Sequence, residues 1–152
     1  MKSITETIVL PEKPENIWRV LADVENFKTW IPLVVDLKIL SKEEVGLGTT
    51  WHITKETDIG FQEIDQEINM FQKNKQISWH DIRSFLDQRA MTQITDMNTV
   101  FTLHSVAGGT MVELSATWEP VGMAGRMFSS VYFKRYTQKR LRQTLNNLRA
   151  VV

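Results

Sequence analysis

The sequence contains no cysteine, which excludes a disulfide framework, a thiolate nucleophile and a thiolate metal site. No run approaches the roughly 20 apolar residues of a membrane-spanning helix. The first residues, Met1 to Glu6, also lack the apolar segment of a secretory signal. We therefore expect a cytoplasmic location and no integral membrane association.

Linker-like tracts rich in proline, glycine or serine are absent, and so are internal repeats and low-complexity segments. Five Trp and seven Phe supply large apolar side chains, each of which can bury about 150–250 Å². A chain of 152 residues is an ordinary length for one domain. We expect a single domain over residues 1–152 whose core needs no disulfide or metal.

The net charge of zero conceals an uneven distribution of charge. Residues 121–152 contain no Asp or Glu, so that this segment carries +7 and the rest of the chain −7. The seven cations are Arg126, Lys134, Arg135, Lys139, Arg140, Arg142 and Arg149. Such a segment either presents a surface to an anionic partner or packs as a cationic helix beside an acidic sheet. We favour the second interpretation and expect no nucleic-acid partner.

Hydrophobic periodicity divides the chain into a β-rich middle and helical flanks. Residues 2–10 alternate as a strand, Pro14 suits a first helical turn, and Asp23 begins a second short helix that Pro32 ends. Turn residues then separate six further strands, at 35–42, 49–57, 61–71, 75–83, 97–106 and 110–119. Residues 84–96 either extend a neighbouring strand or form a loop over a pocket mouth.

After Pro120 and Gly122 the apolar spacing returns to three and four residues, which predicts a long C-terminal helix. About 28 residues at roughly 1.5 Å each would span about 42 Å, the whole width of the domain. The predicted sheet-facing stripe is Met123, Met127, Val131, Leu141, Leu145 and Leu148.

Several short segments in this order resemble the START-like superfamily, also called SRPBCC or Bet v 1-like, and within it the polyketide cyclase/dehydrase-like proteins. The matching segments are residues 14–23 (PENIWRVLAD), 30–32 (WIP), 46–49 (GLGT), 108–112 (GGTMV) and 118–122 (WEPVG). The resemblance covers the whole chain and implies an α+β helix-grip fold. In that fold a curved antiparallel seven-stranded sheet wraps around the C-terminal helix, two short helices follow strand one, and a cavity lies between sheet and helix.

Alternation along the strands sorts the side chains between two faces, because residues i and i+2 share a face. We assign the apolar phase, which includes Met70, to the concave face. The predicted ligand-binding side chains are Trp51, Ile53, Ile64, Gln66, Ile68, Trp79, Phe101, Leu103, Trp118, Met123, Met127 and Val131. Methionine adapts to varied partners and suits a deformable cavity. Ordinary core packing is the alternative for each of these residues.

A few polar residues fall on the same inward phase. They are Lys55, Gln66 and Asp81, with Thr49 and Thr99, and also Glu6 if strand one turns Ile4 and Ile8 inward. An ionisable group that faces an apolar cavity needs a partner or changes its protonation. Lys55, Asp81 and Glu6 are therefore the catalytic candidates. Structural pairing of Lys55 with Asp81, or orientation of a ligand, remains an alternative to acid–base chemistry.

The three histidines, His52, His80 and His104, fall on the opposite, convex phase. Their spacing lacks the i, i+4 pattern of a helical zinc motif. We predict no metal, no other cofactor and no histidine base.

Three functions remain open at this point. The first is binding of a small hydrophobic ligand, such as a lipid, a polyketide or an aromatic metabolite, by a monomer or homodimer. The second is a cyclase or dehydratase, a lyase or isomerase in which Asp81, or Glu6 if it is buried, removes a proton next to a carbonyl while Lys55 or a backbone donor stabilises the enolate. The third is a protein-interaction module that uses the cationic C-terminal helix.

Overall fold

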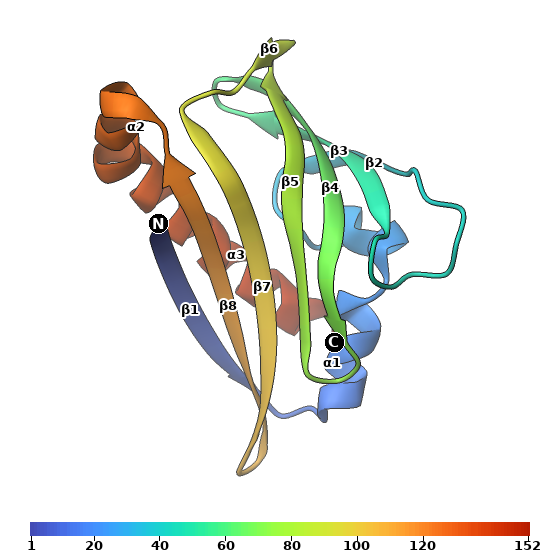
Figure 1. Cartoon of the computed structure of the whole chain (residues 1–152). Coiled ribbons are helices and arrows are strands. Elements are labelled where there is room, and N and C mark those ends of the chain that lie inside the picture. Colours follow the sequence, from blue (N-terminus) through green and yellow to red (C-terminus); the bar gives the residue numbers. More distant parts are fainter.

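The computed structural model describes residues 1–152, and Figure 1 shows one curved sheet with a long helix behind it. The strands are β1 (Lys2–Leu10), β2 (Val34–Ile39), β3 (Thr50–Thr57), β4 (Gly60–Gln72), β5 (Gln76–Leu86), β6 (Arg89–Ala90), β7 (Ile94–Val106) and β8 (Gly109–Pro120). The helices are α1 (Pro14–Leu21), the 3₁₀ helix η1 (Val24–Thr29), α2 (Gly122–Phe128), the π-helical turn η2 (Ser129–Phe133) and α3 (Lys134–Val151).

The sheet is antiparallel in the order β1-β8-β7-β5-β4-β3-β2, and the two-residue strand β6 pairs only with β5. Two short helices follow β1, and the C-terminal helix crosses the concave face of the sheet (Figure 1). The helix-grip fold predicted from the sequence is confirmed. All seven predicted strands are present, and the structure adds one short strand, β6.

Among the register shifts of the sheet, one near the end of β4 changes which face its side chains occupy. The register shifts between Ile68 and Met70 of β4, which leaves an extra residue on that strand and reverses its alternation. Met70 is therefore on the convex side, where it is 37% exposed, and the prediction that it faces inward is wrong. Phe71 points inward instead and packs edge-on against Trp18, with 5.1 Å between ring centres.

Residues 84–96 extend both neighbouring strands and fold into a hairpin at the sheet's end. Asp87 and Gln88 form its two-residue turn, both with positive φ (47° and 67°), and β6 pairs back onto β5. The Asp87 carboxylate accepts a 2.9 Å hydrogen bond from the backbone N–H of Phe61. This contact joins the tip of the hairpin to the tip of the β3–β4 hairpin.

The C-terminal helix presents only half of the predicted stripe to the sheet. Leu141, Leu145 and Leu148 of α3 are buried as expected, but the segment before α3 shows a different face. Met123, Met127 and Val131 are 80%, 65% and 72% exposed, so the prediction that they face inward is wrong. The π turn η2 is the physical reason. It takes one more residue than an α turn and rotates the preceding helix face by about 100°.

Small and polar residues replace the predicted methionines at the inner face of the helix. The inward stripe is Gly125, Ser129, Phe133, Thr137, Leu141, Leu145 and Leu148. A Cβ at Gly125 would lie 2.5 Å from the carbonyl oxygen of Gln93, so only glycine permits this approach of α2 to the segment before β7. The buried Ser129 hydroxyl accepts a 2.8 Å hydrogen bond from Trp118 Nε1.

Candidate functional site

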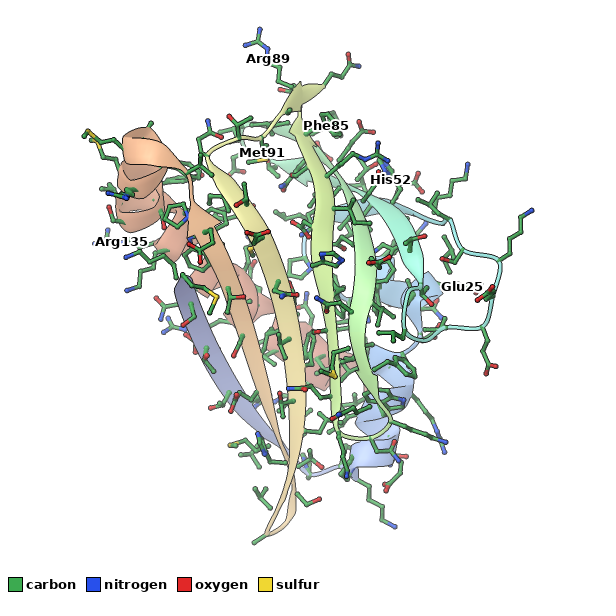
Figure 2. All side chains as sticks on the ribbon, in the orientation of Figure 1. Glu25, His52, Phe85, Arg89, Met91 and Arg135 are labelled. Atoms are coloured by element: carbon green, nitrogen blue, oxygen red, sulfur yellow. The ribbon has the colours of Figure 1, made fainter.

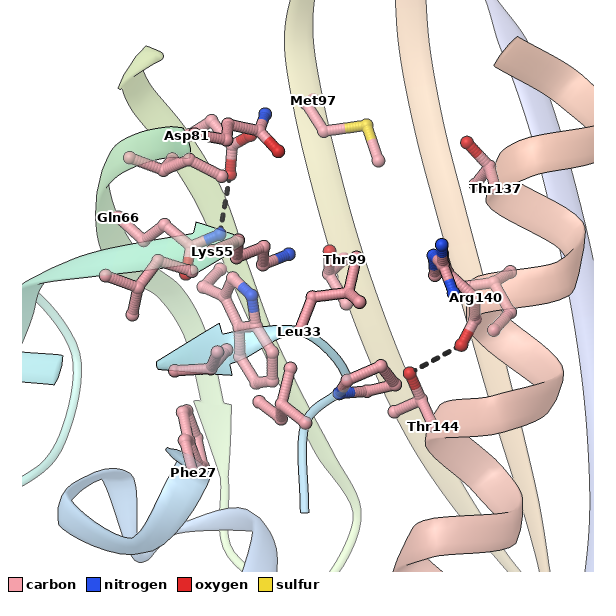
Figure 3. A pocket seen from close by; sticks show the side chains of 18 of the residues that line it. Phe27, Leu33, Lys55, Gln66, Asp81, Met97, Thr99, Thr137, Arg140 and Thr144 are labelled. Carbon is pink, nitrogen blue, oxygen red and sulfur yellow. Dashed lines mark hydrogen bonds between the residues drawn. The ribbon is translucent and has the colours of Figure 1, made fainter. Parts of the chain in front are cut away.

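A cavity of about 140 Å³ lies between the concave face of the sheet and α3 (Figure 3). Fourteen of the 23 residues that line it are hydrophobic. The sheet contributes side chains from β3, β4, β5, β7 and β8, and the segment Ile31–Val34 lines the cavity as well. The cavity therefore lies where the helix-grip fold was expected to leave one.

Aromatic rings make up the floor of the cavity. Phe27 of η1, Trp51 of β3, Trp79 of β5 and Phe101 of β7 line it, with centre-to-centre distances of 5.2–5.8 Å between neighbouring rings. Edge-on and tilted contacts of this kind are favourable and hold the rings in place. All four side chains are buried, so the floor is a packed part of the core.

A chain of hydrogen bonds crosses three strands beside this floor. Trp51 Nε1 donates to Gln66 Oε1 at 2.9 Å, and Gln66 Nε2 donates to Asp81 Oδ1 at 2.7 Å. Gln66 is 6% exposed, so both ends of its amide are satisfied within the protein. This arrangement fixes the Asp81 carboxyl toward the cavity, as Figure 3 shows.

Lys55 and Asp81 line the same cavity, but they form no ion pair within 4.0 Å, so the alternative of a structural pair between them is not what the structure shows. Burial lowers the pKa of Lys55, the negative charge of Asp81 opposes this effect, and Arg140 adds to it. Burial also raises the pKa of Asp81, against the Gln66 hydrogen bond and the charges of Lys55 and His80. Both groups are thus displaced toward their neutral forms.

The sequence-predicted side chains divide into three groups. The structure brings Lys55 and Asp81 together around the cavity with six of the predicted ligand-binding residues, namely Trp51, Ile53, Ile64, Gln66, Trp79 and Phe101. Ile68, Leu103 and Trp118 are buried in the core and do not line it. Met123, Met127 and Val131 are on the outer surface of the helix.

Glu6 does not reach the cavity, which removes it as a candidate for chemistry there. Its carboxylate accepts hydrogen bonds from Gln138 Nε2 at 3.0 Å and from Arg142 Nε at 3.1 Å. The side chain therefore joins β1 to α3. Ile4 is buried as expected, and so the inward phase of β1 is right while the assignment of Glu6 to the cavity is wrong.

Apart from Leu141, which belongs to the predicted sheet-facing stripe, the residues on the helix side of the cavity were not predicted from the sequence. Its lining comes from Phe133, Tyr136, Thr137, Arg140, Leu141 and Thr144. Hydrophobic periodicity gives no signal for threonine or arginine. A search for small and polar residues at a four-residue spacing upstream of Leu141 would have found Thr137 and Ser129.

Leu33 lines the cavity from the segment between η1 and β2 in a strained conformation. Its φ of 69° is in the left-handed region, which costs a non-glycine residue roughly 1–2 kcal/mol. The backbone N–H of Glu56 donates to the Leu33 carbonyl at 3.0 Å and holds this conformation. Strain of this kind gathers at ligand-contacting segments.

A second pocket of about 360 Å³ adjoins the first at Gln62, Asp81, Met97 and Phe133, which line both. It lies between residues 81–85 of β5 and 94–97 of β7, beyond the point where these strands stop pairing at His80 and Asn98. Figure 2 shows Phe85 and Met91 close to the hairpin tip that carries Arg89. The hairpin thus borders an outer pocket that leads to the inner cavity.

All three histidines lie on the convex face, as the alternation predicted, and each faces a carboxylate there. His52 Nδ1 lies 2.6 Å from Asp65 Oδ1 (His52 is labelled in Figure 2), and His80 Nε2 lies 2.9 Å from Glu67 Oε1. His104 Nε2 lies 3.6 Å from Glu113 Oε1. These pairs are at the opposite side of the sheet from the cavity.

Two of the seven cationic side chains of residues 121–152 are directed toward the rest of the protein and not toward solvent alone. Arg142 pairs with Glu6, and Arg140 faces the cavity. The other five, Arg126, Lys134, Arg135, Lys139 and Arg149, are exposed. No helix of the structure is both long enough and apolar enough to span a membrane.

The architecture defined by this sheet, helix and cavity is that of START-like proteins. The sequence model of the family described as "Polyketide cyclase / dehydrase and lipid transport" matches residues 1–152, and the chain belongs to this family. A comparison with curated proteins gave no match.

Solved structures confirm the fold over nearly the whole chain. A START superfamily protein from Mycobacterium smegmatis aligns with a TM-score of 0.76 at 15% identity, covering 99% of this chain and 96% of its own. The protein TTHA0849 from Thermus thermophilus gives 0.77 at 15% identity, with coverage of 98% and 95%. Ara h 8.0201 gives 0.72 at 13% identity, with coverage of 99% and 96%.

Proposed function

We propose that this protein binds a small hydrophobic molecule in the cavity between the sheet and α3. The observation that carries the proposal is an apolar, aromatic-floored cavity onto which a few polar side chains converge from β3, β4, β5 and α3. Ligand sites in proteins have this composition, with polar groups that set the orientation of the ligand. The ligand classes that suit it are lipids, polyketides and aromatic metabolites.

The dimensions of the cavity limit what the ligand can be. An apolar cavity of about 150 Å³ holds a molecule the size of benzene. The inner cavity, at about 140 Å³, therefore accommodates one ring or a short alkyl segment. The remainder of a longer ligand would extend through the shared lining at Met97 and Phe133 into the outer pocket.

Two measurements test this function. Native mass spectrometry of the purified protein should detect a co-purifying apolar molecule or the uptake of an added one. A panel of fatty acids and polycyclic aromatics, each at 100 times its Kd, should stabilise the fold by about 2.7 kcal/mol. For a domain of this size that free energy raises the melting temperature by roughly 5–10 °C. The absence of both effects would refute the proposal.

A cyclase or dehydratase activity is the second candidate, and the pair of Lys55 and Asp81 favours it. A raised pKa makes the ionised Asp81 carboxylate a stronger base, and Lys55 can donate a hydrogen bond to a developing enolate. Hydrogen–deuterium exchange next to the carbonyl of 2-tetralone, followed by NMR in D₂O, would measure this chemistry. Asp81→Asn should abolish the enzyme-dependent exchange and keep the affinity within about tenfold. Unchanged exchange would exclude Asp81 as the base.

A further inference from the structure

Two cations face the inner cavity from opposite walls. Lys55 extends from β3 and Arg140 from α3, and Figure 3 shows both side chains directed into the space between sheet and helix. No hydrogen bond or ion pair of the structure includes the Lys55 ammonium, and the hydrogen bonds beside it run between Trp51, Gln66 and Asp81. The amine of Lys55 therefore donates to no other group of the protein and is available to a ligand in the cavity.

Arg140 also lacks an anionic partner. Its Nη1 donates to Gln143 Oε1 at 2.6 Å, and its guanidinium lies 4.8 Å from the centre of the Tyr136 ring. Its Nε is buried without any acceptor. A buried donor that stays unsatisfied costs about 1–3 kcal/mol, and more when the group is charged. An acceptor supplied from the cavity would remove this cost.

The carboxyl of Asp81 does not supply that acceptor. It is the only acidic residue that lines the inner cavity, it accepts a hydrogen bond from Gln66 Nε2, and it forms no ion pair within 4.0 Å with either cation. The cavity thus holds two cationic side chains and one carboxyl group that is already engaged. Arg140 lowers the pKa of Lys55, as expected for two neighbouring positive groups, while the negative charge of Asp81 acts in the opposite direction.

We infer that the ligand carries a carboxylate, which Lys55 and Arg140 bind between the sheet and the helix. The apolar body of the acid lies on the aromatic floor formed by Phe27, Trp51, Trp79 and Phe101. A guanidinium presents its N–H groups in a planar fork that matches a carboxylate, and an ammonium completes the binding as a point charge. This inference rests on the proposed function and specifies the ligand class as aromatic or aliphatic carboxylic acids.

Matched pairs of probes test the inference. Isothermal titration at pH 7 compares 2-naphthoate with 2-naphthalenemethanol, and decanoate with decanol. The acid of each pair should bind at least tenfold more tightly than the alcohol, a difference of about 1.4 kcal/mol. Lys55→Met and Arg140→Met should each weaken binding of the acid about tenfold or more and leave the affinity for the alcohol within threefold.

Matched controls separate a local effect from misfolding. Arg142→Met removes a cation two residues along the same helix that pairs with Glu6 outside the cavity, so the preference for the acid should persist. Arg140→Lys keeps the positive charge but loses the planar guanidinium that binds a carboxylate through two N–H groups. This variant should retain part of the preference for the acid over the alcohol. Circular dichroism and thermal unfolding verify that each variant folds.

The outcomes distinguish the inference from the function on which it rests. Equal affinity for acid and alcohol in the unmodified protein would overturn the carboxylate inference and leave the apolar-ligand proposal intact. A preference for the acid that survives both Lys55→Met and Arg140→Met would overturn the assignment to these residues. If no probe and no member of the wider apolar panel binds, the proposed function itself fails.

Discussion

The side-chain amide of Gln66 donates a 2.7 Å hydrogen bond to the carboxylate of Asp81 on the neighbouring strand. The oxygen of the same amide accepts a hydrogen bond from Trp51 Nε1 at 2.9 Å. One buried glutamine thus fixes both an aromatic ring of the cavity floor and the carboxyl group that faces the ligand space. Substitution of Gln66 alone should therefore disturb both the aromatic floor and the Asp81 carboxyl group.

Gln66→Leu should lower the free energy of unfolding by about 1–3 kcal/mol, because it leaves Trp51 Nε1 and the Asp81 carboxyl without their partner. Urea unfolding measures the loss. Gln72→Leu is the matched control, since Gln72 is exposed on the same strand and should change stability by no more than about 0.5 kcal/mol. Equal effects of the two substitutions would contradict the described role of Gln66.

Asp81→Asn should alter how stability depends on pH. The pKa of Asp81 is raised by folding, so its contribution is fully present below the unfolded value of 3.8 and is lost as pH rises through the folded pKa. Asparagine keeps the Gln66 hydrogen bond and does not titrate. The variant should therefore gain stability relative to the unmodified protein as pH rises from about 4. Urea unfolding at several pH values measures the difference, and a constant difference would rule out burial of this carboxyl.

Lys55→Met should show the opposite dependence. The pKa of Lys55 is lowered by folding, so stability is lost as pH falls from the unfolded value of 10.5 to the folded pKa. Methionine carries no charge and avoids this loss. Its advantage should grow on acidification from pH 10.5, by at most about 1.4 kcal/mol for each pH unit in that window. A variant less stable than the unmodified protein at neutral pH would show that the Lys55 ammonium is stabilised within the fold.

Phe133→Ala and Met127→Ala test the orientation of the C-terminal helix. Phe133 packs edge-on against Trp118 with 5.0 Å between ring centres, so its loss should cost about 2–3 kcal/mol. Met127 is 65% exposed, and its substitution should cost no more than about 0.5 kcal/mol. Thermal unfolding of both variants gives the comparison. A larger loss for Met127→Ala would mean that the methionine stripe faces the sheet.

Strand alternation predicted the sheet wall of the site from the sequence. Trp51, Ile53 and Lys55 share one phase of β3, and no bulge lies between them, so period two places all three toward the cavity. The alternation failed at Met70, because the extra residue on β4 reverses the phase and has no signature in the sequence.

The helix wall could not be predicted in the same way. A π turn leaves no mark in hydrophobic periodicity, and a regular α-helix brings Met123 onto the same face as Leu141. The actual stripe passes through Gly125, Ser129 and Thr137, whose small size permits close packing but whose polarity resembles that of a solvent-facing surface. Arg140 is polar as well, so the sequence identified it only as one of the seven cations of residues 121–152 and not as a residue of the cavity.

The most direct test of the proposed cavity is to fill it. Thr99 of β7 lines the inner cavity, and its neighbour Val100 lies on the opposite face of the same strand. Isothermal titration with 2-naphthalenemethanol, a neutral apolar probe, compares Thr99→Phe with Val100→Phe. Binding in the cavity requires that Thr99→Phe weaken the affinity at least tenfold and that Val100→Phe leave it within threefold. Undiminished binding to a folded Thr99→Phe variant would contradict the claim that this cavity holds the ligand.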